Sequence, residues 1–417
     1  MSSQKPNLDQ RIGIIGAGAS GLSAAEILKA KGYRHVTLLE RSRVAGGKCC
    51  TLQYKGRAYE LGAAVVSGSD GTIMDLVKKY HIPVKRVRYG KNLLLDAHTG
   101  LPLKDLTLAQ KVAFIYQLLF RYRKLYQSLP RIDEPGLSQL DTELSLPFAK
   151  WSERHEIPLV AQEFANYFTG WGYGYCDEVP AAYVLKHYAW KFIRATIRGR
   201  LYTFPNGIQG LWETVAKEHE VLYNTTIKRI TRTQIVTVET DKGALEFDRL
   251  IITSPLDEAL QFLDAGVEEK ELFKKITHVD YRTYACSIKG FSKQTTYIPG
   301  NFKASRAGHP LFWFAPYADS DLYTCYILGD WKLSDEEATR NIARLVEPLG
   351  GTLQHVERAV HWKYFPHVSS PDMRAGFYDR LEALQGTNHT YYAGELLNFS
   401  SVDQSAGYAE RLIERFF

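Results

Sequence analysis

The segment that most constrains this chain is Arg11–Glu40, RIGIIGAGASGLSAAEILKAKGYRHVTLLE. It begins with a short apolar run, Arg11–Ile15, which is typical of a buried parallel strand. The pattern G-x-G-x-x-G follows directly, at Gly16, Gly18 and Gly21. The first glycine permits a tight turn, the second lets a pyrophosphate approach the backbone, and the third lets the next helix pack closely on the strand. The segment therefore predicts a strand, a phosphate-binding turn and a helix.

The helix and the next strand agree with this interpretation. Ala19, Ser20 and Gly21 open the helix, so its first backbone N–H groups face the expected phosphate. A second strand is expected over Val36–Leu39, and Glu40 follows it, 19 residues after Gly21. An acidic side chain at this place can accept hydrogen bonds from a ribose diol. We interpret the unit as a dinucleotide-binding site rather than a helix N-terminus of an unrelated α/β protein.

Composition places the chain among ordinary globular proteins. Its 417 residues predict about two to three domains. Apolar residues make up 45% and charged residues 24%, and the net charge of +6 is dispersed along the chain. Such a charge suits an anionic cofactor or an acidic ligand but is too weak to indicate nucleic-acid binding.

Cysteine content and hydropathy indicate a reducing compartment. The five cysteines are odd in number and form no metal-type C-x-x-C pair, so we expect neither a disulfide framework nor a metal site. The first ten residues lack an apolar signal core, and no apolar run reaches the roughly 18 residues that span a bilayer. We expect a cytoplasmic protein without a transmembrane segment.

A second glycine-rich segment follows Glu40. Arg41 comes directly after the acid, and Gly46 and Gly47 form another flexible turn. A run of small residues, Gly62–Ala64, comes next; it either packs a turn tightly or lets the backbone approach a large planar ligand.

These segments resemble the flavin-binding fold of the amine oxidase superfamily. The matching strings are GAGASG at 16–21, RVAGGK at 43–48 and YELGA at 59–63, together with Glu40. The superfamily usually has glycine at the place of Ala45. Nicotinamide-binding domains share the first motif but not the second glycine turn, so the resemblance implies FAD rather than NAD.

The resemblance implies an α/β fold: a Rossmann-type FAD-binding domain with a β-rich substrate domain and a helical insertion. We expect the FAD domain over 1–80, 205–255 and 385–417, the substrate domain over 81–104 and 256–384, and the insertion over 105–204. It also implies a set of FAD-binding residues: Gly16, Gly18, Ala19, Ser20, Gly21, Glu40, Arg41, Gly47, Lys48, Gly62, Ala63, Ala64, Val65, Ile227, Gly394, Glu395, Asp403 and Gln404. The last helix is expected to point its positive end at the flavin ring.

Further strings resemble the polyunsaturated fatty acid isomerases of the linoleate type. They are WGYGY at 171–175, PAAYVLK at 180–186, YFPHVSS at 364–370 and YYAGE at 391–395. The resemblance implies a redox-neutral reaction, in which FAD removes a hydride from a bis-allylic carbon and returns it to give a conjugated diene. The flavin N5 atom is then the reactive centre, and no catalytic side chain is expected.

Such a substrate needs a cation for its carboxylate and an apolar tunnel. The resemblance implies Lys91 for the carboxylate, with Arg88 as the alternative, although a solvated surface lysine is about as probable. The tunnel is expected to contain Trp171 and Tyr173. Its entrance gate falls near Thr196, for which Trp190 or Phe192 could substitute.

Two other features allow two interpretations each. The segment Leu106–Leu129 is amphipathic, and we favour a core helix with a solvated basic face over a helix that touches a membrane. His187, His361 and His367 lie in aromatic or apolar stretches, where hydrogen-bonded structural histidines are more common than catalytic bases.

Three functions are therefore compared. The first is the isomerase, with a lipid as its small-molecule substrate. The second is an FAD-dependent oxidase or desaturase of an amine or an isoprenoid, and the third is a flavin or lipid carrier without turnover. We expect a monomer or small homo-oligomer whose membrane contact, if any, is transient.

Overall fold

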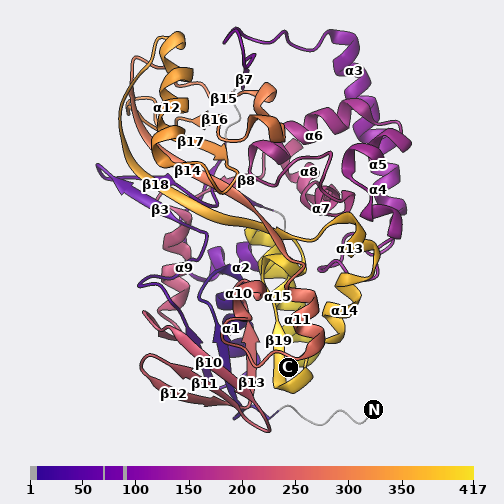
Figure 1. Cartoon of the computed structure of the whole chain (residues 1–417), viewed down its shortest axis with the longest axis vertical. Coiled ribbons are helices and arrows are strands. Elements are labelled where there is room, and N and C mark those ends of the chain that lie inside the picture. Colours follow the sequence, from indigo (N-terminus) through magenta and orange to yellow (C-terminus); the bar gives the residue numbers. More distant parts are fainter. Residues whose placement is uncertain (1–6, 69–70, 88–91) are drawn as a thin grey trace.

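The computed structural model describes residues 7–68, 71–87 and 92–417. At one end of the molecule lies a five-stranded sheet whose neighbouring strands all pair in parallel, in the order β19-β13-β1-β2-β9. Its strands are β1 (Arg11–Ile15), β2 (His35–Leu39), β9 (Glu220–Leu222), β13 (Arg249–Ile252) and β19 (Thr390–Tyr392). Segments from the start, middle and end of the chain thus lie side by side (Figure 1).

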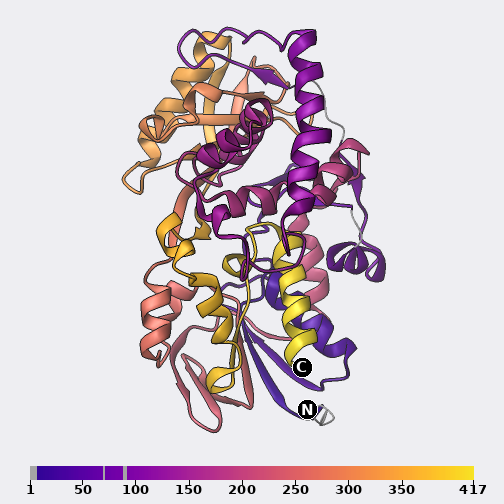
Figure 2. The ribbon, with the colours of Figure 1, turned by 90° about the vertical axis from the view of Figure 1, so that its right-hand side faces the viewer.

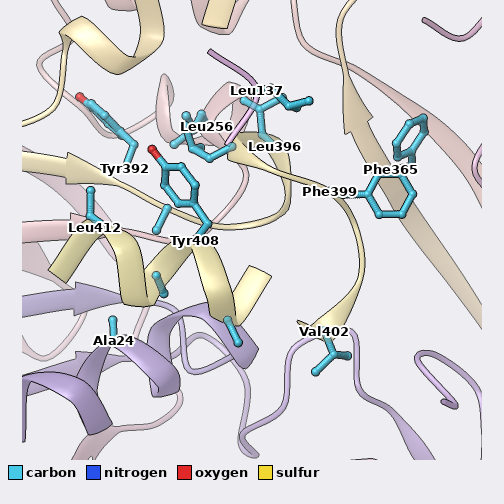
Figure 3. Close-up of a cluster of buried hydrophobic side chains, with 14 of the residues drawn as sticks. Ala24, Leu137, Leu256, Phe365, Tyr392, Leu396, Phe399, Val402, Tyr408 and Leu412 are labelled. Carbon is cyan, nitrogen blue, oxygen red and sulfur yellow. The ribbon is translucent and has the colours of Figure 1, made fainter. Parts of the chain in front are cut away.

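Helices cover this sheet. Helix α1 (Ala19–Ala30) packs against α15 (Val402–Phe416), and Ala24, Tyr408 and Leu412 belong to one buried apolar cluster (Figure 3). The sheet side chains Ile12 and Ile14 are fully buried. Burial of apolar side chains on both faces is the usual condition for a parallel sheet.

A separate three-stranded antiparallel sheet lies beside the parallel one. It contains β10 (Ile227–Arg232), β11 (Val236–Thr240) and β12 (Gly243–Phe247). The chain between 221 and 252 reads as one continuous meander in sequence. The sequence pattern also predicts that 250–255 returns to the nucleotide domain, and β13 does pair in the parallel sheet. At the other end β9 pairs there as well, which the pattern did not predict.

The other end of the molecule contains a six-stranded sheet in the order β18-β14-β17-β16-β15-β7. Its strands are β7 (Leu93–Leu94), β14 (Thr277–Lys289), β15 (Thr296–Tyr297), β16 (Pro310–Phe314), β17 (Leu322–Leu328) and β18 (Thr352–His367). Alternate side chains of a strand point to opposite faces. Trp313 and Cys325 pack on the same side as α12 (Asp335–Val346), whereas Phe312 and Tyr326 belong to an aromatic cluster on the other side.

Helices form a third region beside the six-stranded sheet (Figure 1). They are α3 (Leu108–Tyr116), a π-helical turn (Gln117–Tyr122), α4 (Arg123–Ser128), α5 (Phe148–Arg154), α6 (Pro158–Gly170), α7 (Ala181–His187) and α8 (Trp190–Ile197). Within the described part of the chain, no helix combines the length and the apolar character needed to cross a bilayer.

The interpretation of 106–129 as a core helix is wrong for its first half. Tyr122 and Tyr126 are fully buried, as a core helix requires. Helix α3, however, has no buried residue, and its side chains Val112 and Ile115 are exposed. Helical periodicity identifies an apolar face but not whether another element covers it.

The remaining elements connect these regions: β3 (Thr51–Tyr54), β4 (Arg57–Glu60), β5 (Val66–Ser67), α2 (Thr72–Lys79), β6 (Lys85–Arg86), β8 (Leu201–Thr203), α9 (Ile208–Ala216), α10 (Leu256–Ala259), α11 (Val267–Phe273), α13 (Ser370–Arg374) and α14 (Phe377–Ala383). The strands of the parallel sheet fall within the three segments expected for the FAD domain. The domain boundaries themselves stay a prediction.

Candidate functional site

The first glycine turn connects β1 to α1. Gly16 has a φ of +101°, and its N–H donates to the Leu39 carbonyl at 2.8 Å. A Cβ atom on Gly21 would lie 2.0 Å from the Gly16 carbonyl oxygen. Only glycine is compatible with such a short distance between the helix and the turn.

The second glycine turn lies directly against the first. Gly46 N–H donates to the Ala17 carbonyl at 2.9 Å, and Gly18 and Gly46 form an isolated parallel bridge. Gly47 has a φ of +57°. The two turns together bring several backbone N–H groups to the N-terminus of α1, which is where a pyrophosphate would bind.

Ser20 supports this fit between the turns and a phosphate. Its side chain is buried in the first turn of α1, and its Oγ has no hydrogen-bond partner among residues 7–68, 71–87 and 92–417. A buried hydroxyl without a partner is unfavourable, so a ligand that accepts its hydrogen bond would stabilise this arrangement.

Glu40 lies beside the first turn, at the carboxyl end of β2. Its carboxylate accepts hydrogen bonds from the backbone N–H groups of Ala17, at 2.8 Å, and Ser42, at 2.7 Å. These amides hold the carboxylate in position, and its remaining lone pairs can still accept from a ribose diol. Arg41 is different: its side chain is 81% exposed and forms a long ion pair, 3.6 Å, with Glu258. Ile227 opens β10 in the neighbouring sheet and is partly buried.

An ion pair joins the second glycine turn to the end of the chain. Lys48 Nζ lies 2.8 Å from Glu395 Oε2, and Ser400 Oγ donates to the same carboxylate oxygen at 3.2 Å. Gly394, directly before the acid, has a φ of +110°. Lys48 Nζ also lies 5.4 Å from the centroid of the Tyr364 ring, on the wall of a large cavity.

The small residues Gly62–Val65 form part of the same wall. A Cβ atom on Gly62 would lie 1.9 Å from the Lys48 carbonyl oxygen, and Ala63 N–H donates to that oxygen at 3.1 Å. The segment is therefore folded tightly onto the second glycine turn. Its small side chains leave room for a planar ring.

The N-terminus of α15 lies on the same cavity. Val402, Asp403 and Gln404 line it, and Ser401 caps the helix by accepting the N–H of Gln404. Burial raises the pKa of Asp403 to about 6, although the Ser67 N–H donates to its carboxylate at 3.1 Å. The positive end of the helix dipole thus faces the cavity. That it points at the flavin ring stays a prediction.

The cavity has a volume of about 1720 Å³ and extends from these segments between the six-stranded sheet and the helices. Trp171, Tyr173, Phe192 and Thr196 line it, whereas Trp190 is not among the described lining residues. The Trp190 ring instead packs 5.4 Å from the Arg123 guanidinium. Lys91 and Arg88, the residues expected to bind a carboxylate, lie outside the described residues.

The loop WGYGY contributes two aromatic rings to the cavity wall. Gly172 has a φ of +88°, and a Cβ atom there would lie 2.6 Å from the Tyr281 ring. Tyr173 packs beside Tyr364, with ring centroids 5.4 Å apart, and its hydroxyl donates to the Ser400 carbonyl at 3.3 Å. Glycine at this turn lets the rings of the loop and the sheet pack together.

His187 is a site residue that the sequence did not reveal. Its ring is buried on the cavity wall, and its Nε2 has no hydrogen-bond partner within the described part of the chain, which contradicts our expectation of a hydrogen-bonded structural histidine. Burial lowers its pKa to about 3, so it is neutral. Its ring centroid lies 5.0 Å from that of Tyr173 and 5.2 Å from that of Phe399, which in turn packs against Phe365 (Figure 3).

The other two histidines have structural partners. His361 Nε2 lies 2.7 Å from Asp335, and His367 Nδ1 lies 2.8 Å from the Phe365 carbonyl.

A second unexpected group on the cavity wall is Glu60. Burial raises the pKa of Glu60 to about 7. The Ile208 N–H and the Thr51 hydroxyl both donate to its carboxylate at 2.8 Å and lower the pKa, but by less than burial raises it.

Comparisons with known proteins agree with this geometry. The family model for flavin-containing amine oxidoreductases matches residues 19–402. A crystal structure of a CLA-producing fatty acid isomerase from P. acnes superposes with a TM-score of 0.91 at 32% identity, covering 99% of this chain and all of that one. The FAD-dependent oxidoreductase dpasF of Apiospora sacchari is 27% identical over 92% of this chain and 87% of its own length.

A more distant structure shares the fold. Wild-type putrescine oxidase, solved with putrescine bound, superposes with a TM-score of 0.74 at 15% identity, over 98% of this chain and 99% of that one. The α/β architecture is therefore that of the flavin amine oxidases. The chain is an FAD enzyme and belongs to the flavin-containing amine oxidoreductase family.

Proposed function

We propose that the protein isomerises a polyunsaturated fatty acid, moving a double bond to give a conjugated diene without net oxidation. The observation that carries this proposal is the likeness to the CLA-producing fatty acid isomerase over 99% of the chain at 32% identity. The other two functions, an oxidase or desaturase and a carrier, are outcomes of the test below.

The shape and polarity of the cavity support a lipid substrate. Its wall contains the aromatic side chains of Phe312 and Tyr326 from the sheet and of Trp171 and Tyr173 from the helical region. Burial raises the pKa of the tyrosine hydroxyls, including that of Tyr173, so these groups stay neutral. A long apolar chain would be bound by such a wall, and water would be displaced from it.

When bound, FAD supplies a group that can accept a hydride and return it. The residues of this chain would hold and orient the two reactants. The two glycine turns and Ser20 would bind the pyrophosphate, and Glu40 the ribose. Gly62–Val65 and the first turn of α15 would enclose the flavin ring. The aromatic wall would hold the diene against that ring and keep water out.

No acid–base residue is needed for this reaction. His187 on the wall is neutral, and its Nε2 has no hydrogen-bond partner among the described residues. We propose that it packs against the substrate as part of the aromatic wall. Lys91 or Arg88 stays the predicted partner of the carboxylate.

The test is turnover of linoleate by the purified yellow protein with and without oxygen. The isomerase produces absorbance of a conjugated diene at the same rate in both conditions and releases no peroxide. An oxidase would stop after one turnover without oxygen and release peroxide with it. Linoleate recovered unchanged would indicate a carrier and would overturn the proposal.

A further inference from the structure

Helix α3 and the π-helical turn that continues it, Gln117–Tyr122, expose an apolar face that no described element covers. Leu108, Val112 and Phe120 are 78%, 60% and 64% exposed, and Ile115 and Tyr116 lie between them and are also exposed. The spacing of four, three, one and four residues places these side chains on one side of the helix. Figure 2 shows the helix along the outer edge of the molecule.

The opposite side of the helix is packed, which fixes its orientation. Phe114 and Leu118 pack against the main core. Gln117 Oε1 accepts the N–H of Leu159, at the start of α6, at 3.0 Å. Tyr116 and Phe120 stack on each other with centroids 5.5 Å apart. The exposed face is thus held outward by a folded helix.

The segment that carries this face has an excess of positive charge. Between 101 and 132 the chain has one acid, Asp105, and six basic residues: Lys104, Lys111, Arg121, Arg123, Lys124 and Arg131. Arg121 pairs with Glu156 at 3.1 Å and Arg131 with Glu134 at 2.9 Å. An apolar helix face with basic neighbours is complementary to the headgroups and acyl chains of an anionic bilayer.

The same segment forms one end of the cavity. Leu103, Lys104, Leu106, Lys111 and Phe114 belong to its lining. Leu103 and Leu106 are themselves exposed large apolar side chains. The cavity that we assign to the lipid chain therefore continues to the exposed helix.

We propose that α3, together with the π-helical turn that continues it, docks the protein on the surface of an anionic lipid bilayer. The side chains of Leu108, Val112, Ile115, Tyr116 and Phe120 enter the boundary between headgroups and acyl chains, and the basic residues contact the lipid phosphates. The cavity then opens towards the membrane, so a free fatty acid can pass from the bilayer to the flavin. This last step rests on the proposed function, whereas the docking itself does not.

The experiment measures binding of the FAD-loaded protein to sedimented vesicles. One set contains phosphatidylcholine alone and the other equal parts of phosphatidylcholine and phosphatidylglycerol. We expect binding to the anionic vesicles, weaker binding to the neutral ones, and a loss of binding at high salt, because the lipid charges are then screened.

The test variant is Leu108→Ser/Val112→Ser/Phe120→Ser, which removes the apolar face. Its affinity for anionic vesicles should fall by about tenfold or more, since the apolar contacts are lost. The matched control is Val267→Ser/Trp331→Ser, which removes two exposed apolar side chains, at 87% and 58% exposure, from other parts of the surface. The control should bind like the unchanged protein, and both variants should keep their flavin absorbance and melting temperature.

Three results would overturn the docking proposal. The first is that the unchanged protein fails to sediment with anionic vesicles, and the second is that the test variant binds as well as the control. The third is that the exposed face joins two copies of the chain, seen as a dimer in sedimentation velocity that the test variant converts to monomer. Isomerisation of linoleate dispersed without vesicles is measured in parallel, so that failure of docking and failure of the proposed activity are distinguished.

Discussion

At the scale of single residues, the site depends on positions that no other residue type can fill. Gly21 is one, because a Cβ atom there would overlap the Gly16 carbonyl, and Gly62 is another, because of the Lys48 carbonyl. The first of these could be predicted, since the G-x-G-x-x-G spacing is local in sequence. His187 could not, because its burial depends on rings from distant segments such as Phe399.

Gly18 offers a test of the flavin site that should leave the fold intact. A Cβ atom on Gly18 would meet only Gly47, at 3.7 Å, which is an ordinary contact. The branched side chain of Gly18→Val would, however, occupy the space between the two glycine turns, where the pyrophosphate is expected. We predict a folded, colourless protein, measured by flavin absorbance and circular dichroism. Full flavin content in this variant would contradict the assignment of the turns.

Lys186 predicts a pH dependence of stability. Burial, followed in size by the nearby charge of Lys191, lowers its pKa from 10.5 to about 7. Between these two pH values the unfolded chain binds a proton that the folded protein does not. The free energy of unfolding therefore rises with pH in this window, by up to roughly 1.4 kcal/mol per unit from this group.

The substitution Lys186→Met removes the titrating group and keeps the length of the side chain. Urea unfolding between pH 7 and pH 10 should show a flatter dependence on pH for the variant than for the unchanged protein. Equal slopes for the two proteins would show that Lys186 titrates normally in the folded state.

At the scale of elements, the prediction succeeded where a pattern is complete within one segment. The strand, turn, helix and strand over 11–40 form as expected, and the last helix begins at Val402, next to the expected Asp403. The prediction failed for α3, one apolar face of which points outward, and for the start of the 221–252 meander, where β9 joins the parallel sheet. In both cases the outcome depends on a partner element that local sequence does not identify.

A buried ion pair connects three of these elements. Arg232 on β10 donates to Glu269 on α11 at 2.6 and 2.7 Å, and the Tyr392 hydroxyl on β19 donates to the same carboxylate. The side chains of Arg232 and Glu269 are 1% and 4% exposed. The substitution Arg232→Leu leaves the carboxylate buried without its partner.

We predict that Arg232→Leu lowers the free energy of unfolding by about 3–5 kcal/mol, measured by urea denaturation. The double variant Arg232→Leu/Glu269→Leu should recover most of this loss, because the buried carboxylate is then absent. Asp264 also loses its 2.6 Å contact with Arg232 Nε, but its side chain is 32% exposed and can be solvated. A single variant as stable as the unchanged protein would show that the ion pair is not needed to hold the three elements together.

At the scale of the whole molecule, the proposed flavin site combines segments from both ends of the chain. Lys48 pairs with Glu395, and the Ser67 N–H donates to Asp403. The resemblance implied Lys48, Glu395 and Asp403 but not Ser67. Neither contact could be derived from spacing along the sequence. The cavity likewise combines the six-stranded sheet with helices from a separate region, and its continuation to α3 became apparent only in the folded structure.

The central claim is that the hydride taken from the substrate is returned to it. The most direct measurement uses linoleate with deuterium at its bis-allylic carbon, incubated without oxygen in ordinary water, followed by mass spectrometry of the product. The account predicts a conjugated diene that retains both deuterium atoms, one of them moved to a terminal carbon of the former pentadiene. A diene that has lost one deuterium to water, or no diene at all, would contradict it.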